Sequence, residues 1–134
     1  MTHLLDSSAW LAHLFGEPGV DEVNLLFDTP DTQVSISVLS IPEVFVRLKS
    51  LDKQSHWPEI WQIYSELFSN VFSVDDAIAH QAVRMRAATP ERLPTIDALI
   101  AATAIVRHST LVHRDPHMTA IPLPNLHQQL LPDK

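Results

Sequence analysis

The sequence contains no cysteine and only two glycines, Gly16 and Gly19, among its 134 residues. A chain without cysteine has no disulfide, no thiolate zinc site and no cysteine nucleophile. Two glycines are too few for a phosphate-binding P-loop or a dinucleotide-binding fingerprint, so ATP and NAD chemistry are not expected. Apolar runs of the roughly 18 residues needed to span a membrane are missing as well. Because the N-terminus lacks the pattern of a secretory signal, we expect a cytoplasmic protein with no membrane association.

Basic residues are also scarce. Nine Lys and Arg stand against sixteen Asp and Glu, which gives a net charge of −7 with His neutral. This balance disfavours a protein that grips nucleic acid by a broad basic surface. A nuclease of this composition would need its acids gathered around metal ions, or a basic partner. With 46% hydrophobic and 19% charged residues the chain can build a core, and we expect a single domain over residues 1–134.

Segments with strand-like and helix-like apolar patterns alternate along the chain. Strands are predicted at residues 3–5, 33–37, 70–74, 110–113 and around 119–121, and helices at 7–15, 20–27, 41–50, 57–68, 75–88 and 95–108. The proline-rich residues 122–134 are predicted to form an irregular tail. The alternation predicts an α/β fold of three layers, in which helices cover both faces of a central, mostly parallel sheet.

The stretch from Leu93 to Ala104 sets a carboxylate in the first turn of an alanine-rich helix. Thr95 is a good N-cap by residue type, and Asp97 lies where the positive end of the helix dipole stabilises an anion. The alanines let this helix approach a neighbouring element closely. An acid in a first turn often does no more than start its helix, so the role of Asp97 depends on the acids around it.

Three further acids have comparable positions. Asp6 and Asp115 each follow a predicted strand, and Glu43 lies in the first turn of a helix that Ser40 is predicted to cap through a capping box. In open parallel sheets, sites form at the carboxyl ends of the strands. We therefore expect Asp6, Glu43, Asp97 and Asp115 to converge at one edge of the sheet.

Four carboxylates in one place repel one another, and their convergence calls for a cation. Oxygen ligands in a chain without cysteine favour Mg²⁺ or Mn²⁺ over zinc. Two such ions about 3.5–4 Å apart can activate a water and stabilise the leaving oxygen in phosphodiester hydrolysis. The four acids thus predict a metal-dependent phosphodiesterase.

Four segments carry these acids, namely Leu4–Ser8, Ser37–Glu43, Thr95–Ala102 and Leu111–His117. In order and spacing they resemble the PIN-domain ribonucleases, specifically the VapC-like toxins of bacterial toxin–antitoxin pairs. The resemblance runs from residue 2 to about residue 121. Each motif alone is an acid in a common context, and the specificity lies in their combination.

The resemblance implies a PIN-like α/β/α fold and a Mg²⁺- or Mn²⁺-dependent endoribonuclease that hydrolyses RNA. It also implies a homodimer, a toxin role and a cognate antitoxin protein that blocks the site. Carried over residue by residue, it makes Asp6, Glu43, Asp97 and Asp115 the catalytic metal ligands. Ser8 stands where the family often has a hydroxyl that assists the site.

Two departures from the family pattern affect the prediction. Many members have Thr or Ser two residues before the last acid, where this chain has His113, and Pro42 beside Glu43 is less usual. Arg114 and His117 are weaker candidates for binding the RNA substrate, and each could instead be an ordinary solvated side chain.

Other interpretations remain open at this point. His113 and His117 could bind zinc, although no predicted helix places them on one face. The pair Asp75 and Asp76 could mark a phospho-receiver domain, but it follows the wrong strand, and a helix cap is the favoured interpretation. The alternative function is a catalytically silent PIN-like domain that binds a metal or a partner protein, for example in a repressor complex.

Overall fold

The core of the fold is a five-stranded sheet in which every neighbouring pair of strands is parallel. The computed structural model describes residues 1–134. The strands are β1 (Thr2–Leu5), β2 (Gln33–Ser37), β3 (Asn70–Phe72), β4 (Thr110–His113) and β5 (Gln128–Leu130). Their order in space, β3-β2-β1-β4-β5, puts β1 at the centre. Because all five strands run the same way, all of their carboxyl ends lie at one edge.

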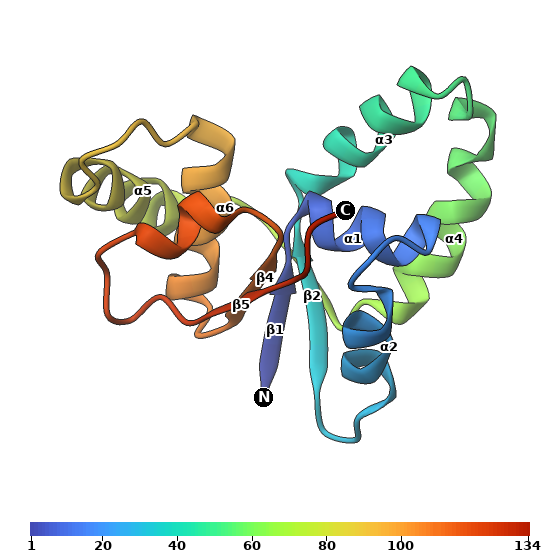
Figure 1. Cartoon of the computed structure of the whole chain (residues 1–134), viewed down its shortest axis with the longest axis horizontal. Coiled ribbons are helices and arrows are strands. Elements are labelled where there is room, and N and C mark those ends of the chain that lie inside the picture. The colour runs from blue at the N-terminus through green and yellow to red at the C-terminus, as the bar shows by residue number, and fades with distance from the viewer.

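Helices cover both faces of this sheet, with α1 to α4 on one side and α5 and α6 on the other (Figure 1). The helices are α1 (Ser7–Phe15), α2 (Val20–Asp28), α3 (Ser40–Ser50), α4 (Trp57–Leu67), α5 (Asp76–Ala88) and α6 (Thr95–Val106), with short 3₁₀ helices at Gln54–His56 and Pro116–Ala120. The predicted α/β class, with a parallel sheet between two helical layers, is confirmed. None of the helices is long and apolar enough to span a membrane.

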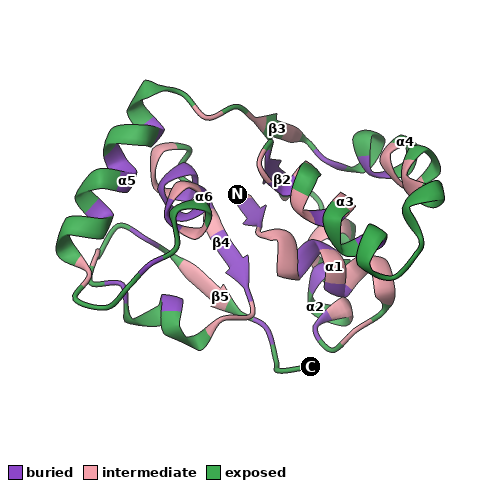
Figure 2. Cartoon of the chain, turned by 90° about the horizontal axis from the view of Figure 1, so that it is seen from above, coloured by how far each residue is buried: buried purple, intermediate pink, exposed green.

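Neighbouring residues of the central strands point to opposite faces of the sheet, which divides the core in two. Leu4 and Leu111 belong to the apolar cluster under α5 and α6, whereas Leu5 and Val112 belong to the cluster under α1 to α4. This follows from the two-residue period of a strand. In Figure 2, β2 and β4 are coloured as buried, while the outer faces of the helices are exposed. Both faces of β1 and β4 are therefore fixed by packing.

The prediction of a strand around residues 119–121 is wrong, because Pro116–Ala120 forms a 3₁₀ helix. Pro116 has no N–H to leave unpaired and its fixed φ suits the first position of a helix. The side chain of Asp115 accepts the next N–H, that of His117, at 2.9 Å. Local capping thus outweighs the weak apolar pattern of this segment.

The prediction of an irregular tail is also wrong in part, since Gln128–Leu130 forms β5 beside β4. Residues 128–130 have no alternating pattern, and the three prolines of the tail favoured irregular chain. The main-chain hydrogen bonds of β4 and the burial of Leu126 and Leu131 hold this short strand in place.

Two predicted helix caps differ from those in the structure. Pro94 takes the cap position of α6, so Thr95 is its first helical residue, and the Thr95 hydroxyl accepts a hydrogen bond from Arg86 instead. Ser40 lies inside α3, and its buried hydroxyl has no hydrogen-bond partner. Glu43 and Asp97 nevertheless lie in the first turns of α3 and α6, as predicted.

Shortening a side chain of the central strand is expected to destabilise the fold. Leu5→Ala removes a fully buried side chain next to the acid that follows β1, and it should lower the free energy of unfolding by about 2–5 kcal/mol. Leu25→Ala is the matched control, because Leu25 is 65% exposed. Urea unfolding measures both, and an equal loss in the two variants would contradict the packing described.

Candidate active site

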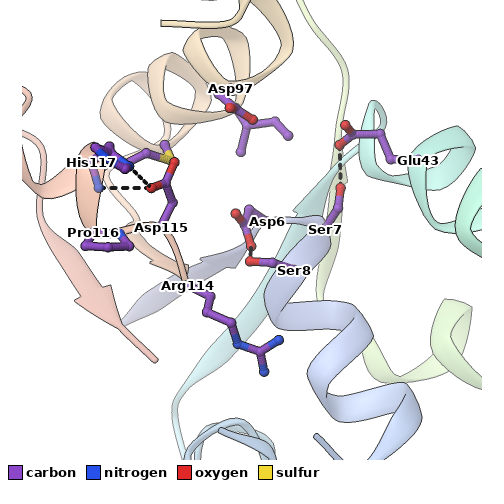
Figure 3. Close-up of a pocket in the computed structure, with 11 residues that line it drawn as sticks. Asp6, Ser7, Ser8, Glu43, Asp97, Arg114, Asp115, Pro116 and His117 are labelled. Carbon is purple, nitrogen blue, oxygen red and sulfur yellow. Dashed lines mark hydrogen bonds and ion pairs between the residues drawn. The ribbon is translucent and has the colours of Figure 1, made fainter. Parts of the chain in front are cut away.

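Four separate elements bring the four predicted acids to one open cavity at the carboxyl edge of the sheet (Figure 3). The cavity has a volume of about 520 Å³. Its lining residues are Asp6, Ser7, Ser8, Glu43, Asp97, Ile100, Arg114, Asp115, Pro116, His117 and Met118. The predicted convergence of the acids on this edge is thus found in the structure.

Asp6 directly follows the central strand and caps helix α1. Its Oδ1 accepts hydrogen bonds from the N–H of Ala9 at 2.9 Å and from the hydroxyl of Ser8 at 2.6 Å. Both bonds use the same oxygen, which leaves Oδ2 for the cavity. Burial raises the pKa of Asp6 to about 6, in spite of the hydrogen bonds from Ser8 and Ala9.

Glu43 reaches the cavity from the first turn of α3. The hydroxyl of Ser7, the first residue of α1, donates a hydrogen bond to one oxygen of Glu43. This contact joins residues 36 positions apart in the chain. It ties the acid of α3 to the same helix start that Asp6 caps.

Asp97 lies in the first turn of α6, and its carboxylate has no hydrogen bond or ion pair with the protein (Figure 3). Burial raises the pKa of Asp97, and the negative charges of Glu43 and Asp115 raise it further. The buried alanines Ala98, Ala101 and Ala102 let α6 pack against the sheet and bring this carboxylate close to the other acids. Asp97 is therefore a half-buried acid with no partner of its own.

Asp115 is separated from the end of β4 by Arg114, and it caps the 3₁₀ helix. Its Oδ1 accepts from the N–H of His117 at 2.9 Å and lies 3.1 Å from the Nδ1 of the same residue. The ring of His117 is 83% exposed at the rim of the cavity. No Lys or Arg pairs with any of the four acids, so the cavity carries uncompensated negative charge.

The donor set fits Mg²⁺ or Mn²⁺ better than zinc. All four acids offer hard carboxylate oxygens, and Asp6 and Asp97 each present at least one oxygen without a protein partner. No three His, Asp or Glu side chains are close enough together to enclose an ion. Mg²⁺ does not require such a cage, because it commonly binds through one or two carboxylates and completes its shell with waters and substrate phosphates.

The three weaker candidates, Ser8, Arg114 and His117, have different surroundings in the structure. Ser8 supports Asp6 directly, and His117 stands at the rim. The guanidinium of Arg114 points away from the acids (Figure 3), and it bonds to Glu17 at 3.2 Å and to the carbonyl of Pro132 at 3.1 Å. The side chain of Arg114 is only 12% exposed. These contacts, together with a bond to the carbonyl of Pro18, hold the guanidinium of Arg114 on the side of Glu17.

Sequence reasoning missed Ser7 as a contact of the site. Its position next to Asp6 in a helix start could have suggested a role, but the partner Glu43 is too distant in sequence to predict. The zinc interpretation finds no support, since His113 is fully buried within the sheet whereas His117 is exposed. Asp75 caps α5 as predicted, with its carboxylate accepting from the N–H of Ile78 at 3.0 Å.

A parallel sheet with an acidic cavity at its carboxyl edge is the architecture of a PIN-like domain. The PIN domain family profile matches residues 3–122, and the chain belongs to this family. PIN domains are generally nucleases, which supports a hydrolase activity for this chain. Among curated protein sequences, none matches the chain.

Several solved structures share the fold at low sequence identity. VapBC2 from Rickettsia felis, bound to a DNA fragment from its promoter, has a TM-score of 0.80 and 18% identity over 97% of this chain and 98% of that one. DNA-bound VapBC from Salmonella typhimurium has a TM-score of 0.77 and 16% identity over 96% and 97%. FitAcB from Neisseria gonorrhoeae has a TM-score of 0.76 and 21% identity over 96% of each chain.

Removing the charge of Asp6 is expected to stabilise the metal-free protein at neutral pH. Its pKa rises from 3.8 to about 6 on folding, so ionisation costs the folded state on the order of 3 kcal/mol. The gain in Asp6→Asn should be absent below pH 3.8, should grow up to about pH 6, and should stay constant above it. Asn preserves the cap acceptor.

Thermal unfolding in excess chelator at about pH 3.5 and about pH 7.5 measures this difference. Asp76→Asn is the control, because that carboxylate is 95% exposed. A gain in Asp6→Asn that is the same at both pH values would contradict the burial of an ionisable carboxyl at this position.

Proposed function

We propose that this chain is a metal-dependent endoribonuclease whose Asp6, Glu43, Asp97 and Asp115 hold Mg²⁺ or Mn²⁺. The observation that carries the proposal is that these four carboxylates, from four elements, line one open cavity with no Lys or Arg paired to them. Divalent ions bound there would lower the pKa of a water and stabilise the charge that develops on a phosphodiester.

The four acids have different parts in this proposal. Asp97 has no protein partner, so both of its oxygens are available to cations, and Asp6 offers the oxygen that does not cap α1. Ser7 orients Glu43, and the N–H of His117 orients Asp115, through one oxygen each. The protein thus orients the carboxylates of Asp6, Glu43 and Asp115 before any ligand arrives, which lowers the cost of assembling the site.

The resemblance to the PIN-domain ribonucleases is what supports RNA as the substrate class, and the cavity can accept a phosphodiester. The cavity lies open at the surface, where an extended strand can lay a phosphate against it. Because the lining offers no free Arg or Lys, attraction of the phosphate depends on the bound cations, helped by the exposed ring of His117. RNA binding should therefore depend on metal more strongly than on salt-sensitive basic contacts.

A toxin role within a toxin–antitoxin pair is the biological setting that we propose. Its support is the membership of the PIN domain family together with the fold shared with FitAcB and with the VapBC structures. VapBC is a family of toxin–antitoxin systems. The net charge of −7 suits a basic antitoxin segment, and an RNA target implies action in the cytoplasm.

Purified protein should cleave a mixed RNA pool with Mg²⁺ or Mn²⁺ and should stop when chelator is in excess. Asp97→Asn removes the carboxylate without a partner and should lower the rate roughly 100-fold or more, whereas Asp76→Asn, on the exposed face of α5, should cleave as the wild type does. Circular dichroism checks that both variants fold.

The result against this proposal is cleavage that persists in chelator or in Asp97→Asn. Absence of cleavage by the wild type, together with absence of Mn²⁺ binding, would favour the alternative of a silent domain that binds a partner protein.

Induced expression of the chain in bacteria is expected to arrest growth, because uncontrolled ribonuclease activity depletes essential RNA. Asp97→Asn expressed at the same level should not arrest growth, and Asp76→Asn should arrest it as the wild type does. Colony counts and immunoblots measure both. Equal arrest by wild type and Asp97→Asn would show toxicity unrelated to the acidic cavity.

A further inference from the structure

His113 is the last residue of β4, and both of its ring nitrogens make hydrogen bonds inside the protein. The side chain is fully buried. Its Nδ1 accepts from the backbone N–H of Asp115 at 3.0 Å, and its Nε2 lies 2.7 Å from the side-chain oxygen of Gln128. The ring thus links an acid of the cavity to the C-terminal strand.

The backbone N–H of Asp115 determines which ring nitrogen of His113 carries the proton. A main-chain N–H can only donate, so Nδ1 must present a lone pair. In the neutral ring the proton is then on Nε2, where it is donated to the amide oxygen of Gln128. The pairing of β5 with β4 places Gln128 opposite Leu111. Leu111 and His113 are two residues apart on β4 and point to the same face of the sheet, so the side chain of Gln128 can reach the ring of His113.

The contact fixes the chain at the point where it turns from the sheet to the cavity. Asp115 begins the 3₁₀ helix, and the direction of its side chain depends on the peptide that His113 holds. The carbonyl of His113 is held as well, by the N–H of Leu131 at 2.7 Å. Gln128 of β5 and Leu131, the residue after β5, therefore both hold the end of β4.

We propose that His113 is a positioning residue for Asp115, and that Gln128 fixes the tautomer this task requires. The inference rests on the proposed function, because it takes Asp115 as a cation ligand. It assigns a function to a buried imidazole that touches neither metal nor RNA, and to a C-terminal strand outside the cavity. Partners of this kind typically change metal affinity about 10-fold to 100-fold when they are removed.

Two amide substitutions separate the two bonds of the ring. In His113→Asn the side-chain oxygen lies where Nδ1 was and still accepts from Asp115, but the bond to Gln128 is lost. In His113→Gln the amide reaches the former position of Nε2 and keeps a bond to Gln128, but Asp115 loses its acceptor. Both variants disturb the buried site, so a merely structural role predicts similar losses in both.

Calorimetric titration of the metal-free proteins with Mn²⁺ measures the difference, and thermal unfolding records the structural cost. We expect His113→Asn to stay within about 3-fold of the wild-type affinity and His113→Gln to bind about 10-fold or more weakly. His80→Gln, a substitution at an exposed position of α5, controls for the loss of an imidazole. Nitrogen-15 NMR of the metal-free wild type should show an unprotonated Nδ1 and a protonated Nε2 at His113.

The outcomes distinguish this inference from the proposed function. Equal weakening in His113→Asn and His113→Gln, or a proton on Nδ1, overturns the positioning role while wild-type Mn²⁺ binding still supports the metal site. Absence of Mn²⁺ binding by the wild type overturns the proposed function and this inference with it. Wild-type affinity in Asp115→Asn overturns the inference and removes Asp115 from the proposed ligand set, while Mn²⁺ binding by the other three acids still supports the metal site.

Discussion

Mutual repulsion among four carboxylates is the constraint on which this structure depends. Asp6, Glu43, Asp97 and Asp115 occupy one cavity, and their proximity raises the pKa of Asp97 beyond the effect of burial. A flexible chain would separate such charges. Here each acid is carried by a strand end or a first helical turn, and the parallel sheet with its two packed helical layers holds those elements together. Part of the folding free energy is thus spent on a site that is unfavourable until cations bind.

The segments around the cavity are held by contacts that leave the acids free. Arg114 pairs with Glu17, which also binds Lys134 at 2.9 Å, so this basic side chain neutralises a distant acid. Burial by itself would raise the pKa of Glu17, but the bonds from Lys134 and Arg114 outweigh it and lower the value. Near these contacts of Glu17 with Arg114 and Lys134, Gly19 adopts a φ of +102°, and a Cβ there would lie 3.1 Å from the side chain of Leu131. The ion pairs of Glu17 with Arg114 and Lys134 therefore join the segment before α2 to the end of β4 and to the C-terminus.

The sequence was sufficient to predict the layers, the parallel sheet and the location of the four acids, because these depend on local periodicity. Asp6 and Asp115 follow apolar strands, and Asp97 begins an alanine-rich helix. Contacts between distant residues could not be predicted in this way. The bond of Ser7 to Glu43 and that of His113 to Gln128 depend on how elements pack and on strand register. The strand β5 was missed for the same reason, since its partner β4 stabilises it more than its own residues do.

Anomalous diffraction from crystals grown with Mn²⁺ would show whether the four carboxylates form a divalent-cation site. We expect a manganese peak inside the cavity, within about 2.0–2.3 Å of carboxylate oxygens of Asp97 and of at least one of Asp6 and Asp115. A peak elsewhere on the protein, or an empty cavity at a saturating Mn²⁺ concentration, would contradict it.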